Sequence, residues 1–138
     1  VTQVIAHRGL SARAPENTAA AFDLALSEGA DGIELDLQIT ADGVVVIYHD
    51  QWLTKLGQPS QRIPDKTWSE LEQADAGGWF DSCFAGQRLL RLEQVFERWG
   101  QQIPLYLEIK AYPGPQAAAA HSRLADAVAG CLGAATGQ

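Results

Sequence analysis

Short apolar segments that end in ionisable residues recur along this chain, and they restrict its possible folds more than any other feature. Segments with the apolar spacing of helices lie between them. The ionisable residues at these ends are His7-Arg8, Glu34 with Asp36, His49-Asp50, and Glu108 with Lys110. Parallel strands connected by helices bring their carboxyl ends to one edge of a sheet, where reactive groups gather. We therefore expect an α/β fold with a functional site at that edge.

The order of the segments predicts three βα units, with an extra hairpin strand in the second unit. Strands are expected near residues 4–6, 33–39, 44–48 and 104–110. Helices are expected from Asn17, as the N-cap, to Gly29, from Leu92 to Gly100, and in the alanine-rich segment after Pro115. The less regular residues 51–90 are rich in aromatic side chains, which indicates an ordered insertion rather than a linker.

The dipeptide Asp42-Gly43 is a turn signal between the second strand and its returning partner. If these two residues form the whole loop, Ala41 faces Val44 and Asp36 faces His49. That register would bring a histidine beside the carboxylates of the preceding strand. A longer loop or a bulge would shift the pairing.

Carboxylates on the strands predict a metal site. Glu34 and Asp36 are two residues apart on one strand, so both side chains lie on the same face. Carboxylates in a poorly solvated interior repel each other unless a cation compensates them. Glu108 adds a third carboxylate from another strand, and three carboxylates suit a hard cation such as Mg²⁺ or Ca²⁺. The sequence has no set of histidines and cysteines with the spacing of a zinc site.

Two histidines and two cationic side chains at the same strand ends suit hydrolysis of a phosphate ester. One imidazole, from His7 or His49, can activate the nucleophile while the other protonates the leaving oxygen. Arg8 and Lys110 can stabilise charge on the phosphoryl oxygens. Which histidine is the acid and which is the base stays open.

The acidic balance of the chain excludes some partners. With 10 basic and 17 acidic residues the net charge is −7, which speaks against nucleic acid or an anionic membrane as a partner. No apolar run is long enough to span a membrane. The two cysteines, Cys83 and Cys131, are too few for a disulfide scaffold. We expect a cytoplasmic protein, and a periplasmic or secreted location after removal of a leader stays open.

The motifs together resemble the glycerophosphodiester phosphodiesterase family in order and spacing. The motifs are His7-Arg8-Gly9, Pro15-Glu16-Asn17-Thr18, Glu34-Leu35-Asp36, Thr40-Ala41-Asp42-Gly43, His49-Asp50 and Glu108-Ile109-Lys110. The insertion is similar as well, through Trp68-Ser69-Glu70-Leu71, Asp75-Ala76-Gly77-Gly78-Trp79-Phe80 and Leu92-Glu93-Gln94-Val95. The chain departs from the family at residues 51–57, where an arginine–threonine pattern is more usual, and a peripheral role is expected for this segment.

The resemblance implies a TIM-type (β/α)₈ barrel, of which this chain holds about the first three βα units. Residues 1–138 would be the N-terminal portion of that domain, with residues 51–90 as an insertion after the second strand. The implied reaction is hydrolysis of glycerophosphodiesters to glycerol 3-phosphate and an alcohol, with Mg²⁺ or Ca²⁺. The matching positions are Glu34, Asp36 and Glu108 for the metal, His7 and His49 for acid/base catalysis, and Arg8 and Lys110 for contacts with the phosphate.

Three alternatives stay open. One keeps the barrel and the metal but changes the substrate to a lysophospholipid, as in a lysophospholipase D-like enzyme. Another is an inactive partial barrel with an unfinished site, whose missing walls self-association could supply. The third concerns Asp50, which could orient His49 or only its own loop. Asn17 is expected to be a helix cap whatever the function.

Overall fold

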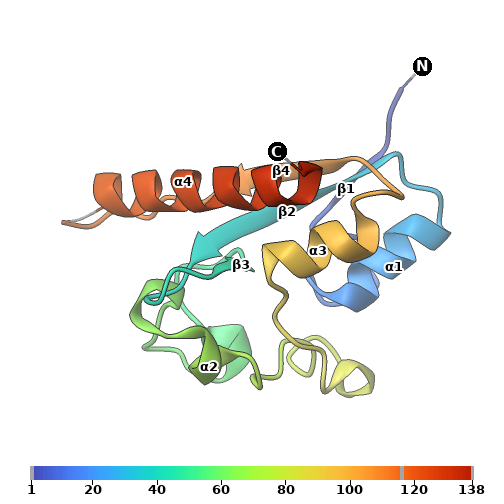
Figure 1. The fold of residues 1–138 in the computed structure, drawn as a ribbon. Helices are drawn as coiled ribbons and strands as arrows, with labels where there is room; N and C mark the ends of the chain where they lie inside the picture. Colours follow the sequence, from blue (N-terminus) through green and yellow to red (C-terminus); the bar gives the residue numbers. More distant parts are fainter. Residues whose placement is uncertain (1, 116, 138) are drawn as a thin grey trace.

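Strands and helices alternate along the chain in the predicted order (Figure 1). The computed structural model describes residues 2–115 and 117–137. Its strands are β1 (Ile5–His7), β2 (Gly32–Ile39), β3 (Val45–Ile47) and β4 (Leu105–Ile109). Its α-helices are α1 (Ala19–Ser27), α2 (Trp68–Leu71), α3 (Leu92–Trp99) and α4 (Ala117–Thr136). Three short 3₁₀ helices, at Thr54–Leu56, Ile63–Asp65 and Ser82–Phe84, lie between β3 and α3.

β2 is the central strand of a four-stranded sheet. β1 runs parallel to its residues 32–34, β4 parallel to its residues 33–37, and β3 antiparallel to its residues 37–39. The residues of β2 that pair with β4 include residues 33 and 34, which also pair with β1, and residue 37, which also pairs with β3. One edge of a strand holds one partner at a given residue, so β4 lies on one edge of β2, and β1 and β3 share the other edge. The parallel strands β1, β2 and β4 therefore follow one another as successive strands of a barrel do, which confirms the predicted partial barrel.

The two faces of β2 differ because its residues alternate. Ile33, Leu35 and Leu37 are fully buried in one hydrophobic core with the helices. In that core the rings of Phe22 in α1 and Trp99 in α3 meet edge to face, with centroids 5.3 Å apart. α3 lies between α1 and α4 on this side of the sheet (Figure 1). The polar residues Glu34 and Asp36 of β2 lie on the opposite face, which is the inner face of the partial barrel.

The hairpin register is shifted by one residue from the one expected for a two-residue loop. The structure pairs residues 37, 38 and 39 with residues 47, 46 and 45. Tyr48, and not His49, therefore lies opposite Asp36, and the Tyr48 amide donates to the Asp36 carbonyl at 3.0 Å. The hairpin does not bring the histidine beside the strand carboxylates in the way expected.

A three-residue loop causes this shift. The Thr40 amide donates to the Val44 carbonyl at 3.0 Å, so residues 41–43 form the loop. The Thr40 hydroxyl donates to an Asp42 carboxylate oxygen at 2.6 Å and accepts from the Val44 amide at 2.9 Å. Gly43 has a φ of +88°, the left-handed conformation with which three-residue hairpin loops commonly end.

The start of α1 corrects a second prediction. Its N-cap is Thr18 instead of Asn17, because the Thr18 hydroxyl accepts from the Ala21 amide at 3.4 Å. Asn17 has a φ of +57° and is almost fully buried. Its side chain is therefore free of the helix and turns toward the sheet.

Residues 51–90 form an ordered segment, as predicted, and share a hydrophobic cluster with β3 and the residue after it. The cluster is mainly aliphatic, and its buried members are Val46, Tyr48, Leu53, Ile63, Leu71 and Leu89. The aromatic side chains of the segment differ in their contacts. Trp68 packs against the cluster, whereas Trp79, Phe80 and Phe84 contact one another edge to face.

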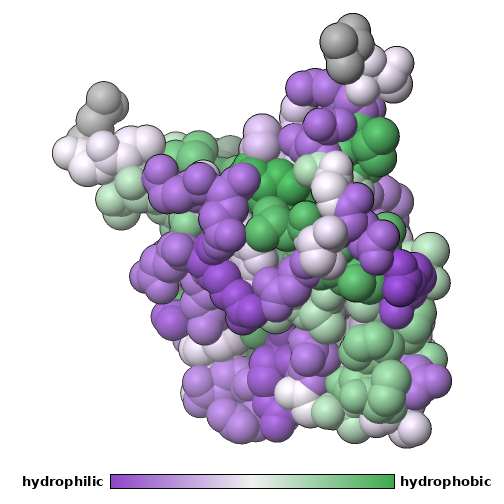
Figure 2. Space-filling model, turned by 90° about the vertical axis from the view of Figure 1, so that its right-hand side faces the viewer, coloured by the Kyte–Doolittle hydropathy of each residue, from purple (hydrophilic) through white to green (hydrophobic). Residues whose placement is uncertain are grey.

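The surface mixes hydrophobic and hydrophilic patches, as the side view in Figure 2 shows. Tyr106 and Glu108 of β4 are exposed on the inner face of the sheet. In a complete barrel, further strands would cover this face. None of the helices in the described part of the chain is long and apolar enough to cross a bilayer.

Candidate active site

The register of the sheet gathers the predicted carboxylates. Asp36 of β2 lies beside Glu108 of β4, and Glu34 lies beside His7 of β1. Neighbours in adjacent strands point to the same face, here the inner one. Glu34, Asp36 and Glu108, the strand carboxylates, each offer one oxygen, and these oxygens all lie within 4.8 Å of one another.

The loop after β1 depends on two residues with positive φ. Arg8 has a φ of +59°, and its amide donates to the Glu34 backbone at 2.9 Å and to a Glu34 carboxylate oxygen at 3.3 Å. Gly9 follows with a φ of +79°, and a Cβ there would lie 2.7 Å from the Ala21 backbone. Only glycine fits this position, so the tight turn presents the Arg8 side chain to the site.

Asp36 is the buried centre of the site, because its side chain is 0% exposed. The Asn17 amide donates to one of its carboxylate oxygens at 2.9 Å, and the Arg8 guanidinium lies 3.2 Å from the same oxygen. The Lys110 ammonium lies 3.1 Å from the other oxygen and 2.6 Å from Glu108. Cations from two loops thus compensate the charge that the inner face buries.

The carboxylates on either side of Asp36 have different environments. Burial, with the nearby charge of Asp36, raises the pKa of Glu34 to about 7. The ammonium of Lys110 holds the pKa of Glu108 below its usual value. Negative charge at Glu34 is therefore unfavourable in the site without a further cation.

The strand carboxylates fit a hard divalent cation. One oxygen of Glu34 is buried and has no hydrogen-bond partner among the described residues, whereas both oxygens of Asp36 have cationic or amide neighbours. A buried polar atom is rarely left without a partner, so the Glu34 oxygen indicates a missing one. Three carboxylates without cysteine or histidine ligands match the preferences of Mg²⁺ or Ca²⁺.

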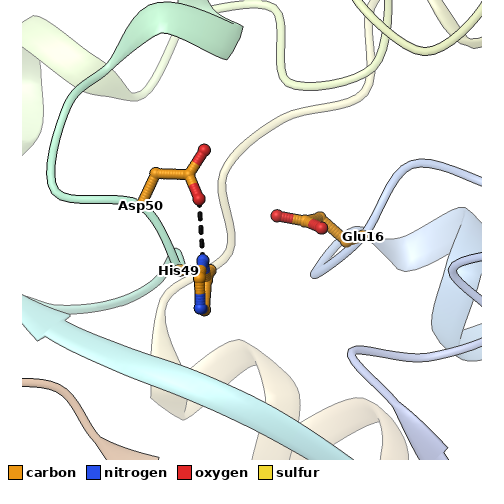
Figure 3. A group of neighbouring side chains, drawn as sticks. All are labelled: Glu16, His49 and Asp50. Carbon is orange, nitrogen blue, oxygen red and sulfur yellow. Dashed lines mark hydrogen bonds and ion pairs between the residues drawn. The ribbon is translucent and has the colours of Figure 1, made fainter.

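The two histidines occupy different positions. His7 is exposed, and its Nε2 lies 3.7 Å from Glu34. His49 directs Nδ1 toward the Asp50 carboxylate at 2.7 Å (Figure 3). Because a carboxylate only accepts, Nδ1 donates in this contact, and Nε2 is left for other partners.

His49 and Asp50 belong to a second group with Glu16 and Lys55, which we call the loop cluster. One ligand-type atom from each of Glu16, His49 and Asp50 lies within 4.8 Å of the others (Figure 3). The Lys55 ammonium lies 2.7 Å from Glu16 and 3.1 Å from Asp50, and over the Trp79 ring at 4.6 Å from its centroid. The lysine already supplies the positive charge that a metal ion would bring.

Of the predicted site residues, six lie together at the strand carboxylates and one lies in the loop cluster. The six are His7, Arg8, Glu34, Asp36, Glu108 and Lys110. His49 is the residue in the loop cluster, and the Arg8 contact with Glu16 at 3.1 Å joins the two groups.

Three residues of the site were not predicted from the sequence as part of it, namely Glu16, Asn17 and Lys55. The first two belong to the motif Pro15-Glu16-Asn17-Thr18, which was interpreted only as a helix start. Lys55 lies in the segment expected to be peripheral, and nothing in the local sequence pattern shows that it reaches Glu16, 39 residues earlier.

Comparisons with known proteins identify the family of this chain. The model of the glycerophosphoryl diester phosphodiesterase family matches residues 7–132. The chain belongs to this family. Its relatives in the family include a glycerophosphodiester phosphodiesterase from Caldanaerobacter subterraneus, 46% identical over 118 residues, or 82% of this chain and 49% of the relative.

Solved structures of the family support the same fold. A phosphodiesterase from Oleispira antarctica, in complex with the product sn-glycerol-3-phosphate, has a TM-score of 0.83 and 33% identity over 96% of this chain. A glycerophosphodiester phosphodiesterase from Agrobacterium tumefaciens has a TM-score of 0.76 and 41% identity over 91% of this chain. The chain spans about half the length of these family members.

Proposed function

We propose that this chain carries the catalytic residues for metal-dependent hydrolysis of glycerophosphodiesters to glycerol 3-phosphate and an alcohol. The observation that carries the proposal is the group of strand carboxylates, with a buried Glu34 oxygen that has no partner among the described residues, beside His7 and Arg8. The names of the relatives and the product bound in the Oleispira antarctica structure support the substrate class.

Glu34, Asp36 and Glu108 would hold the divalent cation, Mg²⁺ or Ca²⁺. When bound, the cation supplies Lewis acidity that stabilises negative charge on the phosphoryl oxygens. The cation would also relieve the repulsion among the three carboxylates, which the structure leaves only partly compensated.

Arg8 and Lys110 bind and orient the phosphate in this proposal. Both side chains are mostly buried, and both are held by Asp36 on the inner face. A guanidinium with two carboxylate partners is fixed in orientation, so it can meet a phosphate with little further loss of freedom.

His7 and His49 move the protons. One removes a proton from the attacking oxygen, and the other protonates the oxygen of the leaving alcohol. His49 would act through Nε2, because its Nδ1 donates to Asp50. His7 is exposed on the inner face at the end of β1, where a substrate can reach it.

The proposal also concerns how much of the domain is present. Residues 1–138 would form the N-terminal portion of the catalytic domain, with residues 51–90 as the insertion of the family. The inner face of β4 is exposed in the structure, so a second copy of the chain is a further candidate partner. Sedimentation of the chain at several concentrations would show whether it associates.

Hydrolysis of glycerophosphocholine, followed by release of glycerol 3-phosphate, tests the function. We expect turnover with Mg²⁺ or Ca²⁺, loss of turnover with EDTA, and recovery when the metal is restored. A parallel assay with lysophosphatidylcholine distinguishes the alternative substrate by its product. Turnover that EDTA leaves unchanged would contradict the assignment of the strand carboxylates.

A further inference from the structure

Among the described residues, only the ammonium of Lys55 contacts both carboxylates of the loop cluster, those of Glu16 and Asp50. It comes from the 3₁₀ helix Thr54–Leu56, outside the sheet. Its ammonium donates to Glu16 at 2.7 Å and lies 3.1 Å from Asp50. The side chain is only 25% exposed and passes over Trp79, so its position is well defined.

The contacts of Lys55 form the middle of a chain of opposite charges. On one side, Asp50 holds the Nδ1 of His49 at 2.7 Å. On the other, Glu16 holds Arg8 at 3.1 Å, and Arg8 in turn reaches Asp36 at 3.2 Å. Lys55 therefore lies between the histidine and the group that binds the metal and phosphate.

We propose that Lys55 is a positioning residue for the reaction: it holds Asp50 against His49 and Glu16 against Arg8, and so sets the imidazole relative to the phosphate-binding side chain. This inference rests on the proposed function. Under this proposal, residues 51–57, which were expected to be peripheral, contribute a side chain that positions the catalytic groups.

The charge of Lys55 is what the arrangement requires. Without it, the carboxylates of Glu16 and Asp50, which lie within 4.8 Å of each other through one oxygen each, repel. Asp50 can relieve this repulsion by turning away, and His49 then loses the acceptor that selects its Nδ1–H tautomer. The lowered pKa of Asp50 agrees with this role: burial opposes the charged form, but the bonds from His49 and Lys55 outweigh burial.

The test compares four variants of the full chain: Lys55→Met, Lys55→Arg, Asp50→Asn and Lys66→Met. The last is a matched control, since Lys66 lies in the same segment with a similarly exposed side chain, paired with Glu70 at 3.4 Å. Circular dichroism and thermal unfolding establish that each variant folds.

The first measurement is ¹⁵N NMR of the histidine rings, with His49 assigned by the signals that disappear in His49→Gln. We expect the Nδ1–H tautomer in the unsubstituted chain, Lys55→Arg and Lys66→Met. We expect it to be lost in Lys55→Met and Asp50→Asn. The same tautomer in Lys55→Met as in the control would overturn the proposal.

The second measurement is glycerophosphocholine hydrolysis. Lys55→Met should lower kcat about tenfold with KM changed less than about twofold, and Lys55→Arg should recover most of the loss. Adding Asp50→Asn to Lys55→Met should cost little more, because both act through His49. Equal loss in Lys55→Arg and Lys55→Met would overturn the proposal. An unsubstituted chain without turnover would contradict the proposed function, while the tautomer measurement would still decide the role of Lys55.

Discussion

The strand carboxylates and the loop cluster are two groups of acidic residues on one molecule. In both groups carboxylates lie close enough to repel each other, but the cations that compensate them are arranged differently. Each brings carboxylate oxygens within 4.8 Å of one another. In the loop cluster, Lys55 contacts both carboxylates. In the strand carboxylates, Arg8 and Lys110 compensate Asp36, yet a buried oxygen of Glu34 has no hydrogen-bond partner among the described residues.

The difference shows how a metal site can be told from an ion-pair network. Both groups contain residues that commonly bind metals, so residue type does not separate them. The partners of the oxygens do, because a buried acceptor without a donor indicates a missing cation or ligand. This difference supports the proposed cation site at the strand carboxylates, and the following predictions test it.

The largest effect is expected from the histidines. His7→Ala and His49→Ala should each lower kcat by about 10²–10⁴-fold, because each removes a group that transfers a proton. His121→Ala is the control, since this exposed side chain lies on α4. Steady-state kinetics with glycerophosphocholine measure the effect, and full activity in either active-site variant would refute this mechanism.

Asp36→Asn should destabilise the protein by about 3 kcal/mol and weaken metal binding. The substitution removes a fully buried charge that holds both Arg8 and Lys110. Urea unfolding measures the stability, and calorimetric titration with Ca²⁺ measures the affinity. Glu28→Gln, at an exposed ion pair with Arg13, is the control. A variant with unchanged stability and affinity would show that Asp36 is not the centre of the site.

Lys55→Met should create a weak second cation site if the ammonium replaces a metal in the loop cluster. Without metal, the repulsion between Glu16 and Asp50 turns Asp50 away in this variant, and a bound cation would draw the two carboxylates together again. Titration with Mn²⁺, followed by electron paramagnetic resonance, should give one ion per chain before substitution and two after it. If the stoichiometry stays the same in both proteins, the ammonium does not act as a substitute cation.

The smallest expected effect is on the free energy of unfolding, to which the two groups contribute with opposite dependence on pH. The pKa of Glu34 is raised to about 7, so without metal its contribution to stability is full below 4.5, its ordinary value, and is lost as pH rises through about 7. The pKa of Asp50 is lowered, so its contribution is present above 3.8, its ordinary value, and is lost as pH falls below it.

Urea unfolding in EDTA across this pH range separates the two contributions. Glu34→Gln should flatten the change between pH 7 and 4.5, whereas Asp50→Asn should flatten the loss below 3.8. Glu72→Gln, at an exposed position of the insertion, is the control. A Glu34→Gln profile that matches the control would contradict the burial of charge at the strand carboxylates.

Local sequence patterns were sufficient for the strands, the order of the units and the residues on the inner face. Alternation along β2 predicted that Glu34 and Asp36 share one face, and the structure confirms this, with Ile33 and Leu35 buried on the other. The period of two is a property of the extended backbone itself, so it is visible in the sequence alone.

The partners of single polar side chains could not be predicted in this way. The hairpin register depended on the side chain of Thr40, which closes a three-residue loop around Gly43. Asn17 was expected to cap α1, but its amide donates to Asp36, 19 residues away. In both cases one polar side chain has several possible hydrogen-bond partners, and local sequence patterns do not show which of them it takes.

The sequence by itself determined which residues lie at the strand ends and that their carboxylates share a face, because strand geometry repeats every two residues. Only the tertiary structure decided which carboxylates contact an ammonium and that a Glu34 oxygen stays buried without a partner among the described residues. That outcome depends on where Lys55 and Lys110 reach in space. Electrostatic interactions depend on distance and burial, which the fold sets and which separation along the chain does not.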